Sequence, residues 1–288
     1  MNINTYFSGA GLFEIGLLQA GLEVQQSFEI DSTCCKTQRN NFQHEVSERD
    51  ISKKLVFDEK ECDVMLATYP CTKYSTAADI SGTRTGDDLF LHFFRHIAIK
   101  KPEVYVVENV PGMKKFPVVM EAMTKLPEYY VSVFCPVYTH KFLPQKRDRL
   151  ILIGSKKHFA WREPEVSRKV SLKEILEKDV SIKIPNYVYK RLDGSYRDKP
   201  IISDPEAGDI APTCVAHYAK DRGTRLVKDK SFPRGVRPYT TLEYARLQGV
   251  PDWFQFHGTE SQVYKQIGNG VPTVFGLWIG KELKRYFK

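Results

Sequence analysis

The stretch SGAGLFEIGLLQAGLEVQQSFEID, residues 8–31, contains the local signals that decide the fold. Gly9 and Gly11 follow a short apolar run and precede a helical pattern, and a second apolar run then ends at Glu29. Glycines between a strand and a helix let a ligand approach the backbone, and the amides of the helix N-terminus point at it. The G-x-G spacing lacks the third glycine of a dinucleotide-binding motif. A plain glycine turn therefore remains an equal alternative for this stretch alone.

Strand and helix patterns alternate through the first half of the chain. Apolar runs predict strands at residues 4–8, 26–30, 63–68 and 104–108, and apolar periodicity predicts helices at 12–20, 32–40 and 89–100. This alternation is typical of an α/β protein with a mostly parallel sheet covered by helices on both faces. Two further strands are predicted at residues 129–138 and 149–154 without a helix between them, which favours an antiparallel hairpin at one edge.

The sequence changes after residue 155. Prolines divide it into short pieces, an Asp193-Gly194 pair predicts a turn, and only residues 171–178 have a helical pattern. Helical patterns return from residue 240, and the last one, starting near Pro272, is apolar enough to pack on the sheet. We therefore expect a main domain, a smaller irregular lobe and a returning C-terminal segment, at residues 1–154, 155–236 and 237–288.

Composition narrows the class of protein. The 288 residues are 42% hydrophobic and 12% aromatic, which excludes a disordered chain. No apolar run approaches the roughly 20 residues of a membrane span, and the N-terminus lacks a signal-peptide pattern. The six cysteines include no CxxC and no zinc-type spacing. We therefore expect a reduced, cytoplasmic setting, no membrane contact and no metal.

Positive charge is concentrated in the lobe. The net charge is +8, and residues 155–237 carry 19 Lys or Arg against 12 Asp or Glu, a surplus of seven. Contacts to phosphate depend on such side chains, so this distribution favours a nucleic-acid partner, although basicity alone is a weak signal.

A cysteine and a glutamate follow two of the predicted strands. Cys71 lies in ATYPCTKYS, residues 67–75, and Glu108 ends the strand in VYVVENVPGM, residues 104–113. Loops at the carboxyl ends of parallel strands form the ligand crevice of such sheets. A carboxyl group desolvated there would have a raised pKa and could act as an acid. An inert, half-buried thiol is the ordinary alternative for a lone cysteine.

Three polar residues alternate in LPQKRDRLILIG, residues 143–154: Gln145, Arg147 and Arg149. On a strand, period-two spacing points both arginines at one face. Two guanidinium groups on one face suit a phosphate or a carbonyl oxygen, and a solvated edge strand is the alternative.

Six stretches in this order resemble the cytosine carbon-5 DNA methyltransferases, over almost the whole chain except the lobe. FSGAGLFEIGLLQAG is similar to the family's cofactor loop, YPCT to its Pro-Cys nucleophile motif, and ENV and QKRDR to two motifs of its catalytic pocket. RGVRPYTTLEYARLQGVPDWF and QIGNGVPTVFG are similar to its two C-terminal motifs. The chain departs from the family at Thr68, Tyr69 and Thr72, where a glycine, a second proline and a glutamine are usual.

The resemblance implies a Rossmann-like methyltransferase sheet with a target-recognition lobe. It implies transfer of a methyl group from S-adenosylmethionine to carbon 5 of a cytosine in a short duplex DNA sequence, with S-adenosylhomocysteine as product. Cys71 would add to carbon 6 of a base extruded from the duplex. Glu108 would hydrogen-bond to or protonate ring nitrogen 3. Arg149 and Arg147 would hold the ring carbonyl or a flanking phosphate.

The resemblance also implies which residues bind the cofactor. The glycine turn would hold the methionine part and Glu29 the ribose. Ile30 and Ile51 would contact the adenine, and Asp50 its exocyclic amine. The expected set is Phe7, Gly9, Ala10, Gly11, Leu12, Glu29, Ile30, Asp50, Ile51, Pro70, Asn269 and Val271.

By the same resemblance, the lobe is similar to the family's target-recognition region. APTCVAHYAKDRGTRLV, residues 211–227, is similar to the loop that enters the major groove. The expected DNA contacts are Thr213, Arg222, Arg225 and Gln145, and the expected partners are double-stranded DNA and a cognate restriction endonuclease. The protein is expected to be a monomer.

Two alternatives remain open from sequence. The first is an RNA cytosine-5 methyltransferase acting on tRNA, against which the sizeable basic lobe argues. The second is a catalytically silent DNA-binding relative, which the changes at Tyr69 and Thr72 suggest and the presence of Cys71 and Glu108 opposes.

Overall fold

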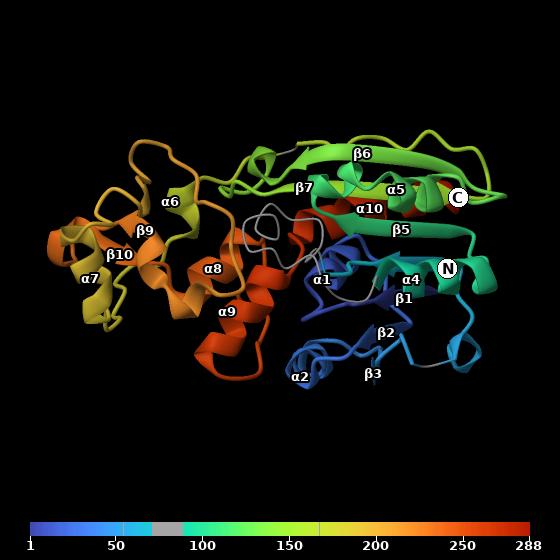
Figure 1. Cartoon of the computed structure of the whole chain (residues 1–288), viewed down its shortest axis with the longest axis horizontal. Helices are drawn as coiled ribbons and strands as arrows, with labels where there is room; N and C mark the ends of the chain where they lie inside the picture. The colour runs from blue at the N-terminus through green and yellow to red at the C-terminus, as the bar shows by residue number, and fades with distance from the viewer. Residues whose placement is uncertain (54, 71–88, 167) are drawn as a thin grey trace.

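A computed structural model describes residues 1–53, 55–70, 89–166 and 168–288 (Figure 1). The predicted nucleophile Cys71 therefore lies outside the described residues. The main domain contains a seven-stranded sheet in the order β3-β2-β1-β4-β5-β7-β6. Its strands are β1 (Ile3–Tyr6), β2 (Gln26–Glu29), β3 (Glu45–Glu48), β4 (Val64–Ala67), β5 (Val104–Asn109), β6 (Tyr130–Tyr138) and β7 (Asp148–Ser155).

The pairing of the strands confirms the predicted fold class. Strands β3, β2, β1, β4 and β5 are parallel, whereas β7 pairs antiparallel with both β5 and β6. The β6–β7 pair is the predicted hairpin, with β6 at the sheet edge. Chain order reverses at β1, which has β2 on one side and β4 on the other. Ligands of open α/β sheets bind at the carboxyl ends of the strands at such a reversal.

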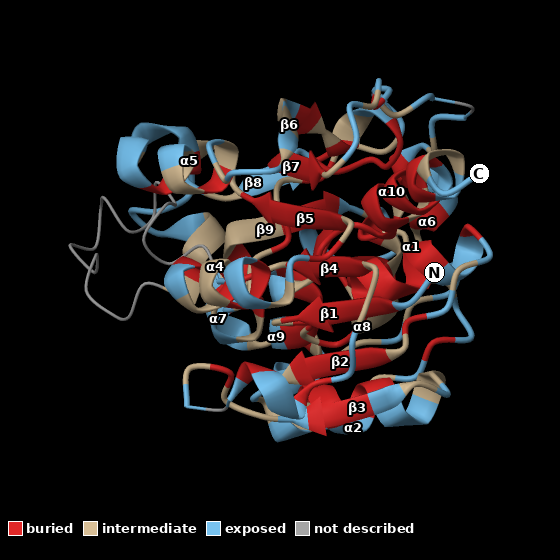
Figure 2. Cartoon of the chain, turned by 90° about the vertical axis from the view of Figure 1, so that its right-hand side faces the viewer, coloured by how far each residue is buried: buried red, intermediate tan, exposed pale blue. Residues whose placement is uncertain are grey.

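Helices cover both faces of this sheet (Figure 2). On one face lie α1 (Leu12–Gln19) and α10 (Thr273–Tyr286), and on the other lie α4 (Leu89–Lys100) and α5 (Pro117–Thr124). Helix α2 (Ser32–Asn41) packs near β2 and β3 at the sheet edge. Alternate residues of β4 enter the two cores: Leu66 packs with α1 and α10, and Met65 packs with α4. A strand buried on both faces reads as a continuous apolar run, as it does here.

The last helix returns to the sheet as the sequence predicts, and two glycines allow its close contact with α1. A Cβ at Gly16 would lie 2.1 Å from the Thr273 carbonyl oxygen, and a Cβ at Gly276 would lie 2.1 Å from that of Phe13. The two backbones therefore touch directly. Leu17, Phe275 and Ile279 surround this contact within one core.

The lobe contains a three-stranded sheet in the order β10-β9-β8. Its elements are α6 (Leu172–Ile175), α7 (Asn186–Asp193), β8 (Ile201–Ser203), β9 (Arg225–Lys228) and β10 (Val236–Pro238). The helix predicted at residues 171–178 is one short turn, and α7 was not predicted. Strand β10 also crosses the expected boundary at residue 236. Helices α8 (Thr241–Leu247) and α9 (Glu260–Asn269) lie between the lobe and the main sheet (Figure 1).

In the part of the chain that the structure describes, no helix is long and apolar enough to cross a membrane.

Candidate active site and cofactor site

The glycine turn between β1 and α1 has an unusual backbone. Phe7, Gly9 and Gly11 have φ values of 56°, 56° and 85°, all in the left-handed region that favours glycine. At Gly9 an added Cβ would meet nothing within 4 Å, whereas at Gly11 it would lie 2.5 Å from the Phe42 ring. Gly11 is therefore required by packing. Gly9 borders open space, as a turn that admits a ligand must.

Glu29 is held against this turn from the end of β2. Its Oε2 accepts a hydrogen bond of 2.7 Å from the Gly9 amide, and its Oε1 accepts from the amides of Ile30 and Asp31, both at 2.8 Å. Burial raises the pKa of the Glu29 carboxyl, and these three hydrogen bonds oppose that rise. Beside it, the Ile30 side chain is 65% exposed. A fixed carboxylate and an exposed aliphatic side chain lie together at the predicted ribose and adenine positions.

The other predicted cofactor residues divide into surface and interior groups. Asp50 is partly buried, and its carboxylate accepts from the Ser52 amide at 3.0 Å. Ile51 is buried, and its carbonyl accepts from Arg95 of α4 at 2.7 Å. Ala10 and Leu12 are buried in a core shared with the C-terminal segment, so their side chains pack inward.

The C-terminal motif lies next to the same site. Asn269 is exposed at the end of α9 and lines a small crevice together with Asp31 and Thr33 at the start of α2. Lys265 forms an ion pair of 3.1 Å with Asp31 across this crevice. Val271 is buried in the main core. Asn269 and Glu29 are 240 positions apart in the sequence, and the structure brings Asn269 close to the end of β2 at which Glu29 lies.

The entrance to the predicted nucleophile loop is tied to β5. The Asn109 side-chain amide donates to the Tyr69 carbonyl at 3.2 Å, and Thr68 Oγ1 donates to the Phe7 carbonyl at 2.9 Å. Tyr69 is buried, its ring packs edge-on against Phe7 at 6.1 Å, and its hydroxyl donates to the Met113 sulfur. Pro70 follows, exposed, as the last described residue before Cys71. Tyr69, two positions before Cys71, thus lies beside the end of β5.

Glu108 and Arg149 form a buried ion pair across β5 and β7. Arg149 Nε lies 2.6 Å from Glu108 Oε1, and both residues are less than 10% exposed. Burial raises the pKa of the Glu108 carboxyl, and the positive charges of Arg149 and Arg147 oppose this rise. The pair therefore places a carboxyl group with increased proton affinity next to a fixed cation, at the carboxyl end of β5.

Arg147 has internal partners that its spacing did not indicate. It precedes β7, and its guanidinium donates to the carbonyl oxygens of Cys214, Gly268 and Gly270, at 2.8, 3.1 and 2.8 Å. It therefore connects the sheet with the lobe loop and with the C-terminal motif. The period-two pattern did not identify these partners because they lie more than 60 positions away.

Gln145 corrects one prediction. It is fully buried, its amide nitrogen donates to the Leu247 carbonyl and to Gln248, and its amide oxygen accepts from the Cys214 backbone at 2.9 Å. A side chain with no exposed surface and with its polar atoms bonded internally does not fit the expected DNA contact. The residue connects two interior segments instead.

The three other expected DNA contacts lie at the junction between the lobe and the C-terminal segment. Thr213 is partly exposed, and its hydroxyl donates to the Lys146 carbonyl. Arg225 Nε donates to the Thr213 carbonyl at 3.2 Å. Arg222 pairs with Glu260 of α9 and lies over the Tyr264 ring at 5.1 Å. Each arginine therefore has a partner within the protein.

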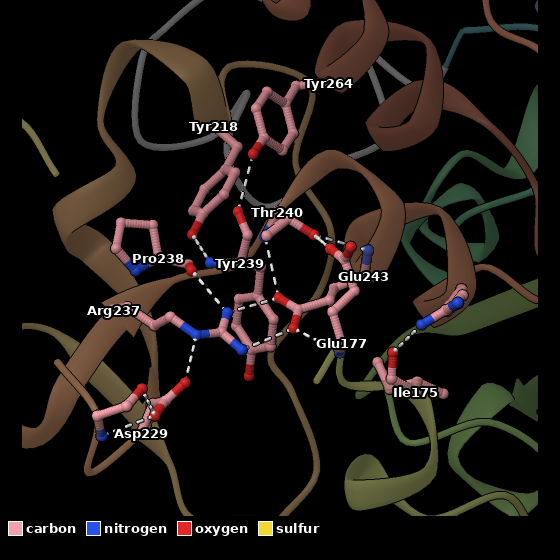
Figure 3. A network of polar contacts seen from close by, with 12 residues as sticks. Ile175, Glu177, Tyr218, Asp229, Arg237, Pro238, Tyr239, Thr240, Glu243 and Tyr264 are labelled. Carbon is pink, nitrogen blue, oxygen red and sulfur yellow. Dashed lines mark hydrogen bonds and ion pairs between the residues drawn. The ribbon is translucent and has the colours of Figure 1, made fainter. Parts of the chain in front are cut away.

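Sequence reasoning did not identify the network that joins the lobe to α8 (Figure 3). Arg237 is 1% exposed and bonds to Glu243 through two nitrogens at 2.7 Å and to Asp229 through a third at 2.7 Å. Glu243 also accepts from the backbone amides of Thr240 and Glu177, both at 3.0 Å. The available signal was the capping pattern T-x-x-E at residues 240–243 beside an arginine.

Within the described residues, no cluster of His, Cys, Asp and Glu side chains could hold a metal ion.

Comparison with known proteins identifies the family. A family model described as C-5 cytosine-specific DNA methylase matches residues 1–285. The Type II methyltransferase M.PspPI of Psychrobacter sp. is 30% identical, with 97% of this chain and 78% of that protein covered. M.NgoFVII of Neisseria gonorrhoeae is 29% identical over 94% of this chain and 83% of its own length.

The fold agrees with this comparison. A solved structure of the Entamoeba histolytica methyltransferase EhMeth matches with a TM-score of 0.82 at 19% identity, covering 100% of this chain and 99% of that one. At this identity the match concerns the fold alone, whereas the family model spans nearly every residue. The chain therefore belongs to the C-5 cytosine-specific DNA methylase family.

Proposed function

We propose that this chain methylates carbon 5 of cytosine in duplex DNA through Cys71, with Glu108 and Arg149 holding the base. Family membership makes the chain a DNA cytosine methyltransferase and implies S-adenosylmethionine as methyl donor. The assignment of the catalytic residues is supported mainly by the buried pair of Glu108 and Arg149. This pair lies at the end of β5, and the neighbouring Asn109 is bonded to Tyr69, two positions before Cys71.

The residues at the carboxyl ends of β1 and β2 fit the donor. Gly9 borders open space, Glu29 presents a carboxylate fixed by three amides, and Ile30 exposes an apolar side chain beside it. S-adenosylmethionine supplies a methyl group on a positively charged sulfur. In this proposal Glu29 binds the ribose hydroxyls, Ile30 and Ile51 contact the adenine, and Asn269 closes the site from α9.

The reaction balances with the residues proposed. The Cys71 thiolate would form a bond to carbon 6, which moves an electron pair onto carbon 5. Carbon 5 would then take the methyl group as the sulfur–methyl bond of the donor breaks, and neutral S-adenosylhomocysteine would leave. Burial raises the pKa of Glu108, and in this proposal Glu108 hydrogen-bonds to or protonates ring nitrogen 3 and takes that proton back when the product forms, while Arg149 holds the ring carbonyl. Loss of the carbon-5 proton to water breaks the bond to Cys71 and restores the thiolate.

The lobe is the proposed site of sequence recognition. Its surplus of positive charge suits the phosphate backbone, and the base must leave the stack before Cys71 can reach it. Thr213, Arg222 and Arg225 are proposed DNA contacts that would exchange their internal partners for phosphate or base edges. Since the two relatives are named Type II methyltransferases, a restriction endonuclease acting on the same site is the proposed functional partner. The methyltransferase itself is proposed to act on DNA in the cytoplasm, as a monomer.

Methyl transfer from labelled S-adenosylmethionine tests this function directly. The purified chain is incubated with duplex DNA or with tRNA, and the nucleosides are separated after digestion. We expect 5-methylcytosine in DNA only, and none with Cys71→Ser. Duplex DNA containing 5-fluorocytosine should form a denaturant-stable adduct with the native chain but not with that variant. Methylation of tRNA alone, or an adduct that forms with Cys71→Ser, would contradict the proposal.

A further inference from the structure

Beneath the glycine turn lies a buried glutamine that the proposed function does not use. Gln38 belongs to the second turn of α2, is fully buried and sits behind the glycine turn rather than in the open site. Its amide nitrogen donates to the Ser8 hydroxyl at 2.8 Å and to the Gly9 carbonyl at 2.7 Å. Because the Gly9 carbonyl can only accept, the amide nitrogen must face it, and this fixes the orientation of the side chain.

The Gly9 residue is thereby held from both sides. Its N–H donates to Glu29 Oε2 at 2.7 Å, and its carbonyl accepts from Gln38 at the same distance. Gly9 has a positive φ and borders open space, so its own packing does not fix its conformation. The two hydrogen bonds supply that restraint. Gln38 therefore influences both the shape of the turn and the position of the Glu29 carboxylate.

A directional chain of hydrogen bonds supports Gln38 from the other side. The Ser27 hydroxyl donates to Gln38 Oε1 at 2.7 Å, and His44 Nε2 lies 3.1 Å from the Ser27 oxygen. Burial lowers the pKa of His44 to about 4, so the ring is neutral at pH 7. Because the Ser27 hydroxyl gives its hydrogen to Gln38, the matching tautomer has its hydrogen on Nε2, which then donates to Ser27. At the far end, the Ser8 hydroxyl donates to the Phe28 carbonyl at 3.3 Å. Every step has a donor facing an acceptor, so the chain needs no ionised group.

From this geometry we propose that Gln38 is a positioning residue for the methyl donor. It holds the turn at residues 8–11, with Glu29 attached, in the arrangement that binds S-adenosylmethionine before the ligand arrives. Such pre-organisation increases affinity because less freedom is lost on binding. Ser27 and His44 orient the Gln38 amide. This inference rests on the proposed cofactor site and adds to it a residue that touches neither substrate nor donor.

Gln38→Met tests the role, because methionine has a similar volume and no amide. A matched control is Gln26→Met. Gln26 is also a buried glutamine, but it lies at the start of β2, at the end opposite to Glu29, and it bonds to Glu45, Ser47 and the Lys60 amide. Loss of buried polar contacts should lower the unfolding temperature of both variants. Only Gln38→Met should alter the donor site.

The measurement is the dissociation constant of S-adenosylmethionine and of S-adenosylhomocysteine, by calorimetry on the full chain without DNA. For Gln38→Met we expect both constants to rise about tenfold to hundredfold, as loss of two hydrogen bonds predicts. We expect Gln26→Met to stay within about twofold of the native chain. In steady state, the KM for the donor should rise in Gln38→Met while the KM for DNA stays unchanged.

Gln38→Glu adds a readout that a merely structural role would not change. Above the pKa of the new carboxyl, an ionised oxygen faces the Gly9 carbonyl and cannot donate, so donor binding is weak. As the pH falls below that pKa, the protonated carboxyl can donate and binding recovers towards the native value at the same pH. A Gln38→Met affinity equal to that of Gln26→Met would overturn the role of Gln38 alone. Failure of the native chain to bind either ligand would overturn the proposed cofactor site as well.

Discussion

Two ion pairs of the C-terminal segment, one with the lobe and one with the cofactor half of the molecule, differ in burial. Arg237 and Glu243 are 1% and 0% exposed at the side chain, whereas Lys265 and Asp31 are 57% and 32% exposed. In water the attraction between two charges is mostly offset by hydration and screening. In the interior neither charge can recover its hydration when its partner is removed. Removal of one charge should therefore lower the free energy of unfolding strongly at the buried junction, Arg237 with Glu243, and only slightly at the exposed junction, Lys265 with Asp31.

The buried pair at the catalytic end gives the largest expected effect. We expect Glu108→Ala to lower kcat by about 10²- to 10⁴-fold, since removal of a positioned acid has effects of this order. Arg149 would also lose its partner 2.6 Å away. Donor affinity should not change, because Glu29 and the glycine turn lie on other strands. Single-turnover methylation and calorimetry separate the two quantities. A kcat within about threefold of the native value would contradict the assigned role of Glu108.

Arg237 gives the next effect, on stability and on DNA binding. Arg237→Met leaves Glu243 and Asp229 without their shared cation, which should lower the free energy of unfolding by about 3–5 kcal/mol. The double variant Arg237→Met/Glu243→Leu should recover part of this loss, because it removes the stranded carboxylate. Urea unfolding measures both effects. DNA binding should weaken more than donor binding, since the network joins β10 of the lobe to α8 (Figure 3). Equal unfolding free energies for Arg237→Met and the native chain would contradict the claim that the buried ion pair contributes more to stability than the exposed one.

The main sheet and the glycine turn could be predicted because their signals are local. Strand and helix periodicities placed β1, β2, β4 and β5 within one or two residues of their observed ends. The Gly9 and Gly11 positions follow from the need for positive φ directly after a strand. The order of motifs then indicated the family, which the comparisons confirm. These signals survive in a single sequence because each depends on neighbours a few residues away.

The interior polar contacts could not be predicted, because their partners are distant in the sequence. Gln145 and Arg147 look like exposed polar residues of an edge strand, yet they bond to segments near residues 214, 247 and 268. Arg237 gave no sign of its burial, since a charged residue is usually exposed. Helix α7 was missed because Pro185 and the surrounding charges conceal its short apolar face. Periodicity assigns a face to a residue but does not identify what packs against that face.

Glu14 extends the comparison to a buried carboxyl group whose pKa is not lowered by a neighbouring cation. It lies on α1 against Thr5, and burial raises its pKa from the ordinary 4.5 to about 7. The folded chain therefore holds this proton over a range in which the unfolded chain has released it. Stability should fall as pH rises from about 4.5 to about 7, by about 3 kcal/mol in total. We expect Glu14→Met to lose that part of the pH dependence, as measured by urea unfolding at pH 5 and pH 8. An unchanged difference between the two pH values would contradict this.

The exposed junction gives the smallest effect, and two variants can isolate its charge. Lys265→Met and Asp31→Asn each remove the 3.1 Å ion pair, and each should cost only about 0.2–1 kcal/mol of unfolding free energy.

Asp31 has a second role, since its carboxylate accepts from the amides of Thr33 and Cys34 and so caps α2. Asparagine retains this cap and alanine does not, so Asp31→Ala should cost about 0.5–2 kcal/mol more than Asp31→Asn. In 1 M salt the loss in Lys265→Met should nearly vanish, because screening already weakens the native pair, whereas the capping loss should remain. A loss in Lys265→Met that persists in salt and matches that of Arg237→Met would show that burial does not decide the strength of these contacts.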